Sequence, residues 1–428
     1  MRRRDFLTTG IGGAAGLAAI RPVASLADAG TTVAAPTAPA VYFLPGYRPD
    51  LAHYRGRPVP EAPEFRRQLP EGYSGEATLV TRIDEADGSI RRALLPIRGH
   101  AITLNPAGGP AFWNSMDRAM QLAFDPATLE LVALRNLGED FVGGGHAIAL
   151  PDGKHVLATE RRSYASWQGD PGKHEGRLAI RDAENLRLVE AFGCGGMAPH
   201  DAVLLPDGKH VAVANYGSLL GADGWHPEIH APSISVVELA SGRLAANFPS
   251  DDRTAEVRHL AADSDGAPLA LLVRRGSIEE RDALLRDVAE IYEPDGSSFD
   301  DGAYLPAPIW RPGAPPGARA IWPADRLDAR QGQTVLYDAR AGEFIAVFTA
   351  SHRVIAIDAK SSRITACVDT ERLGLRYPRG VGLHPDGEHY AVSGSWQDIM
   401  LFRRGTHAPA PERRIGASLF HHSHLTVG

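Results

Sequence analysis

The stretch "GGGHAIALPDGKHVLATERR", from Gly143 to Arg162, contains the pattern that decides the fold. Three glycines precede His146, and an apolar run then leads to an Asp-Gly turn at Asp152. A second run rich in strand-forming residues follows the turn. Two strand-sized runs joined by an Asp-Gly pair are typical of a β-hairpin.

Nearly the same phrase recurs along the chain. It returns as "PHDAVLLPDGKHVAVANYG" around His200, as "RHLAADSDGAPLALLV" around His259, and as "RGVGLHPDGEHYAVSGS" beginning at Arg379. Weaker copies lie at His100 and Arg319, and the spacing is about 55 to 60 residues. A hairpin unit with this period predicts a β-propeller, because a single four-stranded blade cannot bury both of its faces without neighbours.

The two ends of the chain supply a further blade. "HHSHLTVG" stops four residues after His424, which fits one innermost strand, while "EATLVTRID" and "SIRRALLPI" near the start lack such a strand. Joining them gives an all-β, seven-bladed propeller over residues 73–428, whose last blade is closed by N- and C-terminal strands. One helix is expected from Ser277 to Tyr292, where apolar residues have helical spacing.

The N-terminus resembles a twin-arginine export signal over residues 1–29. "MRRRDFL" carries the paired arginines, a weakly apolar run follows, and "ASLADA" offers small residues for cleavage. That run is too short and too rich in glycine for a stable membrane span. We therefore expect a periplasmic protein, with residues 30–72 as a proline-rich lead-in. Such signals export folded proteins, often with a cofactor already inserted.

Composition excludes several classes of function. The 428 residues include 45 glycines, 32 prolines and two cysteines, which does not suit a disulfide scaffold. A net charge of −7 gives no support for binding nucleic acid or an anionic membrane. The sequence also lacks a Walker loop, a dinucleotide-binding glycine pattern and a C-x-x-C-H haem attachment site.

The innermost strand of each propeller blade begins at one mouth of the central channel. The predicted starts are His100, His146, His200, His259, Arg319, Arg379 and His424. Five of only 17 histidines therefore fall at positions defined by the repeat. Imidazole is the commonest metal ligand and proton-transfer group, so the pattern favours a functional site. Alternatively, polar residues at strand starts cap turns or satisfy carbonyl groups, with no chemistry of their own.

The register of the repeat leaves one position open. His146 lies six residues before its turn aspartate, whereas His200 lies seven before Asp207. Side chains alternate along a strand, so an offset of one residue turns a side chain away unless a β-bulge restores it. Asp201 occupies the six-residue position, and either His200 or Asp201 faces the channel.

The favoured function is a transition metal, iron or copper, held by the five histidines. Asp201 could orient the imidazoles from outside the metal shell. "CGGMAPH" places Cys194 and Met197 beside His200 as further sulfur donors, although a packed cysteine and methionine explain the same residues.

Two alternatives remain open. In the first, Arg319 and Arg379 hold an anion while a histidine acts as general base, which would make the protein a lactonase-like hydrolase. The segments "HVAVANYG" and "SISVVELASGRL" resemble the repeats of lactonase-like propellers. In the second, the propeller is a docking platform without catalysis. Its contact residues would be the loop tryptophans Trp113, Trp167, Trp225 and Trp310.

Over nearly its whole length the chain resembles a bacterial family of exported propellers known as domain of unknown function 1513. The matching features are the twin-arginine start, the phrases around His146 and His200, the arginine of "YPRGVGLHPDG" and the histidine of "HSHL". The resemblance implies kinship with YVTN-type and quinoprotein-type propellers. It also implies a genetic setting beside imelysin-like proteins linked to iron uptake, and hence an imelysin-like periplasmic partner. It brings no established activity.

Overall fold

The computed structural model places one compact unit from Thr37 to Gly428. The residues that it describes are 39–46, 53–54, 57–58, 64–167, 173–218, 220–221, 224–225, 231–253, 255–274, 305–313, 320–322, 329–394, 398–416 and 424–428. The predicted signal at 1–29 and the helix predicted from Ser277 to Tyr292 lie outside these residues. No helix among the described residues is long and apolar enough to cross a membrane.

The described elements are almost all strands. In chain order they are β1 (Val41–Gly46), β2 (His53–Tyr54), β3 (Arg57–Pro58), β4 (Arg66–Arg67), β5 (Thr78–Asp84), β6 (Ile90–Leu95), β7 (Gly99–Thr103), β8 (Ala111–Ser115), β9 (Met120–Phe124), β10 (Leu131–Asn136), β11 (Phe141–Ala149), β12 (His155–Arg162), α1 (Tyr164–Trp167), β13 (Glu175–Asp182), β14 (Leu188–Met197), β15 (Pro199–Leu204), β16 (His210–Asn215), β17 (Leu220–Gly221), β18 (Gly224–Trp225), β19 (Ser233–Glu238), β20 (Leu244–Pro249), β21 (Ala255–Ala262), β22 (Pro268–Arg274), β23 (Ile309–Trp310), β24 (Ala320–Ile321), β25 (Gly332–Asp338), β26 (Glu343–Phe348), β27 (Arg353–Asp358), β28 (Ile364–Asp369), η5 (Glu371–Leu373), β29 (Pro378–Leu383), β30 (His389–Gly394), β31 (Ile399–Arg403), β32 (Pro409–Ile415) and β33 (Thr426–Val427).

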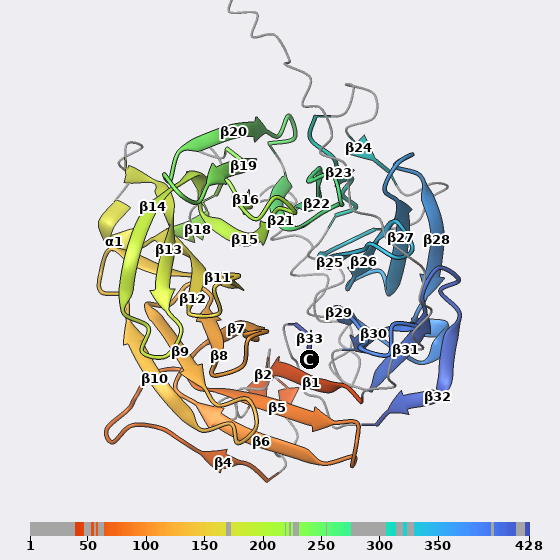
Figure 1. Cartoon of the computed structure of the whole chain (residues 1–428), viewed down its shortest axis with the longest axis horizontal. Helices are drawn as coiled ribbons and strands as arrows, with labels where there is room; N and C mark the ends of the chain where they lie inside the picture. The colour runs from red at the N-terminus through yellow and green to blue at the C-terminus, as the bar shows by residue number, and fades with distance from the viewer. Residues whose placement is uncertain are drawn as a thin grey trace, which may run out of the picture. The chain divides into compact units, whose positions relative to one another are not determined.

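Seven sheets form the blades, and this confirms the predicted seven-bladed β-propeller. We number the blades along the chain. Blade 1 combines β33, β1, β5, β6 and β4, and blades 2 to 7 begin with β7, β11, β15, β21, β25 and β29. Figure 1 shows these six strands and β33 around the centre of the ring.

The two ends of the propeller meet in blade 1. Strand β33 pairs antiparallel with β1, with Tyr42 opposite Val427 and Phe43 opposite Thr426. The backbones of Val41 and Gly428 add two hydrogen bonds of 2.8 Å. Strand β1 lies within the lead-in that the sequence predicts at 30–72, and its four central residues are buried. Its apolar run is short and lies among proline and arginine residues, so the sequence pattern does not predict a strand there.

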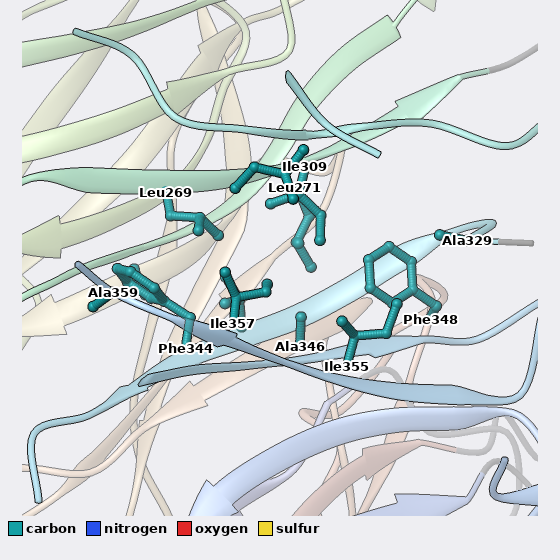
Figure 2. Close-up of a cluster of buried hydrophobic side chains, with 13 residues drawn as sticks. Leu269, Leu271, Ile309, Ala329, Phe344, Ala346, Phe348, Ile355, Ile357 and Ala359 are labelled. Atoms are coloured by element: carbon teal, nitrogen blue, oxygen red, sulfur yellow. The ribbon is translucent and has the colours of Figure 1, made fainter. Parts of the chain in front are cut away.

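Apolar side chains between neighbouring blades form the core. Between blades 5 and 6, Leu269, Leu271 and Ile309 face Phe344 and Ile357 (Figure 2). Burying side chains of this size contributes roughly 1.5–3 kcal/mol each. Alternation along each strand supplies both faces of a blade with such residues, so the blades stabilise one another.

The repeated "PDGKH" phrase has a structural role in the hairpin turns. Asp152 Oδ1 accepts hydrogen bonds from the backbone N–H groups of Lys154 and His155, and Oδ2 lies 2.6 Å from His155 Nδ1. Burial disfavours the carboxylate, but these hydrogen bonds hold the pKa of Asp152 below its ordinary value. The same aspartate–histidine pair recurs as Asp207 with His210 and as Asp386 with His389.

Candidate metal centre

The innermost strands of blades 2 to 7 share a break in register near their starts. The breaks lie between Gly99 and Ile102, Gly143 and Ala147, Pro199 and Asp201, Val257 and His259, Gly332 and Thr334, and Pro378 and Gly380. A β-bulge inserts an extra residue and redirects the side chains beside it. Each of these strands can therefore direct neighbouring residues toward the channel.

This bulge resolves the choice between His200 and Asp201. His200 is the extra residue in its strand, while Asp201 keeps its ladder position opposite Ala214. His200 is 1% exposed and contacts other histidines, and Asp201 contacts the rings of two of them. Both side chains therefore belong to the site, and in blade 5 Arg258 and His259 occupy the corresponding two positions.

The structure brings together the five histidines that the repeat selects. His146 has ring centroids of all four others within 5.1 Å, and His100 and His424 approach most closely, at 4.4 Å. The described residues include two triads whose ligand atoms lie within 4.8 Å of one another, and both contain His146. The triads are His100, His146 and His424, and His146, His200 and His259.

The five imidazoles are neutral at neutral pH. Burial is the largest cause that lowers the pKa of each ring, and neighbouring histidines or arginines lower it further. Asp201 opposes the effect at His146, whose pKa still falls to about 4. Neutral imidazole is the form that binds a metal ion, so little proton release is needed before an ion can enter.

The outer ring nitrogens are fixed by hydrogen-bond acceptors. His200 Nδ1 lies 2.6 Å from the Gly144 carbonyl oxygen and must donate to it. His424 Nδ1 lies 3.2 Å from the Thr334 hydroxyl, which itself donates to the Arg379 carbonyl. These contacts make Nε2 the nitrogen that carries the lone pair in each ring, and His424 Nε2 lies 2.9 Å from His100 Nε2. His200 Nε2 and His146 Nε2 are both buried without a hydrogen-bond partner in the described part of the chain.

Asp201 serves two of the histidines at once. Its Oδ1 lies 3.2 Å from His146 Nδ1, and its Oδ2 lies 3.6 Å from His259 Nδ1 and 3.3 Å from the Leu260 N–H. Burial raises the pKa of this carboxyl, but the two rings and the N–H group outweigh burial and lower it. A carboxylate behind a metal-binding imidazole fixes its orientation and increases its basicity.

The glycines before His146 allow the rings to approach. A Cβ atom on Gly145 would lie 2.7 Å from His100 Cδ2 and 2.9 Å from His200 Cε1, and the residue has φ +112°. A Cβ on Gly144 would lie 2.4 Å from the Pro199 carbonyl oxygen. Any side chain at these two positions would collide with the site or its frame.

Side chains of second strands hold the bulged backbone. Thr159 Oγ1 lies 2.9 Å from the carbonyl oxygens of both His146 and His200, and Asn114 Nδ2 donates to His146 at 2.8 Å. These carbonyls lie where the ladder is interrupted, so side-chain donors satisfy them instead. The repeat pattern carries no signal for either residue, because Thr159 is replaced by Ala214 in the copy around His200 and Asn114 lies between the aligned phrases.

Two arginines and a tyrosine that the sequence did not single out border the histidines. Arg161 pairs with Asp117 at 2.8 Å, and its Nη2 lies 3.0 Å from His200 Nδ1. The guanidinium groups of Arg161 and Arg258 lie 4.2 and 5.2 Å from the Tyr216 ring centroid. The Tyr216 ring is 4.5 Å from that of His200. Local sequence cannot reveal this layer because it combines three blades.

The two predicted arginines have different outcomes. Arg379 is the extra residue in the bulge of blade 7, is 7% exposed, and lowers the pKa of His424. Arg319 lies outside the described residues. Strand β24, directly after it, is the outermost strand of blade 5, and Gln333 takes the bulge position of blade 6.

The remaining candidates lie in packed positions. Cys194 is buried among aliphatic side chains, its thiol donates to the Gly196 carbonyl, and burial raises its pKa to about 12. Such a thiol is a poor metal ligand at neutral pH. Met197 packs beside Tyr216. Trp113 and Trp310 are 0% and 7% exposed, so neither is an exposed docking residue; the side chains of Trp167 and Trp225 lie outside the description.

Comparison with known proteins supports a family resemblance over part of the chain. Residues 93–295 match the family described as "Protein of unknown function (DUF1513)". The match confirms the family resemblance of the repeated phrases, and it spans four of the five histidines. No curated protein matches the chain.

The chain is similar to solved structures at low sequence identity. "Kuenenia stuttgartiensis Hydrazine Synthase" is 14% identical with a TM-score of 0.53, and the match covers 79% of this chain and 94% of that one. A functionally unknown protein from Desulfotomaculum acetoxidans is 13% identical with a TM-score of 0.47, covering 73% and 81%. The first likeness supports the fold and nothing further.

Proposed function

We propose that this propeller binds one transition-metal ion, iron or copper, through His100, His146, His200, His259 and His424. The convergence of four buried imidazoles and the partly buried His146, all neutral, carries the proposal. Nitrogen-rich sites suit iron and copper. Turn-forming polar groups would suffice for a purely structural ring, and the buried Nε2 atoms of His146 and His200 have no hydrogen-bond partner among the described residues.

The proposed setting is the periplasm. The twin-arginine pattern at 1–29 supports export after folding, which suits a protein that acquires its ion in the cytoplasm. The imelysin-like partner and the iron-uptake setting rest on family resemblance and stay predictions. The docking-platform function was expected to use four tryptophans. The two whose side chains are described, Trp113 and Trp310, are buried and cannot form an exposed contact surface.

The hydrolase alternative has weaker support. A general base works best when its pKa lies near the operating pH, and the pKa of His146 is about 4. Burial lowers the pKa of the other four rings as well. Five weak bases in contact suit metal ligation better than proton abstraction.

Elemental analysis of the exported protein tests the proposal. We expect about one equivalent of iron or copper per chain, strongly reduced by His259→Ala. His155→Ala is the matched control, because His155 begins β12 next to the turn and its ring pairs with Asp152. Trace metal that His259→Ala leaves unchanged would overturn the proposal, and hydrolysis of lactones by the metal-free protein would favour the alternative.

A further inference from the structure

The contacts among the five imidazoles have the connectivity of a square pyramid. Eight of the ten possible ring pairs have centroids between 4.4 and 5.2 Å apart. Four of these pairs form a closed cycle in the order His100, His200, His259, His424. The other four join His146 to every member of that cycle. Four rings therefore form a base, and His146 is the apex.

The two candidate triads of ligand atoms cover two of the four edges of this base, each together with the apex. Each triad contains His146 and one edge of the base, His100 with His424 or His200 with His259. A ligand that is adjacent to all the others occurs at the apex of a square pyramid. In a tetrahedral site only four ligands could take part.

The distance between two of the inner nitrogens fits a square base. His100 Nε2 lies 2.9 Å from His424 Nε2. Two nitrogens bound at about 2.05 Å and at right angles lie about 2.9 Å apart, whereas a tetrahedral angle places them about 3.3 Å apart. The pair is thus spaced for adjacent ligands of a tetragonal ion.

We propose that the site is built for copper(II), with His100, His200, His259 and His424 as equatorial ligands and His146 as the apical ligand. This inference rests on the proposed metal-binding function and names its ion. Tetragonal nitrogen sites favour copper(II) or nickel(II), and copper(II) binds most tightly of the divalent first-row series. The Asp201 carboxylate lies behind His146 and His259, so the ion meets imidazole nitrogens.

Electron paramagnetic resonance of the full-length protein loaded with one equivalent of copper(II) tests this assignment. We expect an axial spectrum, and pulsed measurements that count four equatorial imidazoles. Apical ligands are bound more weakly, so His146→Ala should keep the axial spectrum and lose less than about tenfold in copper affinity. His259→Ala should lose more than about 100-fold and lower the count of equatorial imidazoles.

The outcomes separate the two proposals. If copper(II), iron(II) and zinc(II) all fail to bind, the proposed function is wrong. If copper binds but the spectrum is not axial, or fewer than four equatorial imidazoles are counted, the square-pyramidal site is wrong while metal binding stands. Equal losses in His146→Ala and His259→Ala would also overturn the apical assignment. The pulsed count on the unsubstituted protein decides the matter even if His146→Ala fails to fold.

Discussion

His146 and His155 stand nine residues apart in the same repeated phrase, yet they occupy opposite ends of one hairpin and different environments. His146 lies in the bulged start of β11, with its side chain 13% exposed and surrounded by four other imidazoles. His155 begins β12 at the turn, with its side chain 29% exposed and paired to Asp152. Both recur with the blade period. Repetition therefore identifies histidines with a structural role as readily as those that converge at the channel.

The contrast lies in what each imidazole faces. In the turns, Nδ1 and the backbone share one aspartate, and the pair closes a local loop of four residues. At the mouth, the acceptors of Nδ1 come from other blades, as with His200 and the Gly144 carbonyl. The turn histidines are held by residues of one blade, whereas the central histidines are held by residues of several blades. Substitutions can therefore test the two groups of histidines separately.

Gly145→Ala should have the largest effect on metal binding. The new methyl group would collide with His100 and His200, and φ +112° is unfavourable for alanine. We expect metal binding to be lost, as measured by calorimetric titration. The turn control is Gly208→Ala, at φ +65° with no atom within 4 Å of the added Cβ. That change should cost about 1 kcal/mol of stability and leave metal affinity unchanged. Full binding by Gly145→Ala would contradict the close packing of the rings.

His200→Ala compared with His210→Ala separates the two classes of histidine directly. We expect the first to weaken metal binding by more than about 100-fold, since a ligand with a fixed tautomer is removed. The second removes an exposed turn pair worth roughly 0.2–1 kcal/mol and should bind normally. Similar affinities in the two variants would show that the ring histidines are no more functional than those of the turns.

Asp201→Asn should have an intermediate effect. The amide keeps the size of the side chain but loses the charge that two imidazoles share, so metal affinity should fall about 10- to 100-fold. Asp207→Asn in the following turn is the matched control and should change affinity little. Wild-type affinity in Asp201→Asn would mean that the carboxylate has no role in orienting His146 and His259.

The smallest effect expected is on metal affinity between pH 7.5 and 6. The imidazoles are already neutral there, because burial holds their pKa values low. We expect a change of less than about threefold, whereas ordinary imidazoles would begin to take up protons near pH 6.5. A tenfold loss over this range would contradict the lowered pKa values.

The metal-free protein should nevertheless lose stability in acid. Below pH 6.5 the unfolded chain binds protons at these histidines, while the folded chain does not until its own lower pKa values are reached. The free energy of unfolding therefore falls as the pH falls from 6.5 toward 4, and His146 alone contributes about 3 kcal/mol to this loss. Urea unfolding at a series of pH values measures it, and a free energy of unfolding that does not fall between pH 6.5 and 4 would contradict the lowered pKa values.

The repeat period predicted the number of blades and the histidine positions, because each blade begins with a residue that the phrase locates. It could not predict that both His200 and Asp201 enter the site, since the bulge that permits it depends on pairing with β16. The repeat period also predicted that blade 6 begins at Arg319. Its innermost strand β25 begins at Gly332 instead, and Gln333 takes the bulge position, because the phrase is weak in this blade. Arg161, Thr159 and Tyr216 approach the centre only through the packing of separate blades, for which the local sequence has no period.

X-ray absorption spectroscopy of the protein loaded with one equivalent of copper(II) tests the central claim most directly. Five imidazole nitrogens should surround the ion, four at about 2.0–2.1 Å and one farther away, with strong scattering from the outer ring atoms. A shell of three or fewer imidazoles, or one dominated by oxygen or sulfur, would contradict the five-histidine centre.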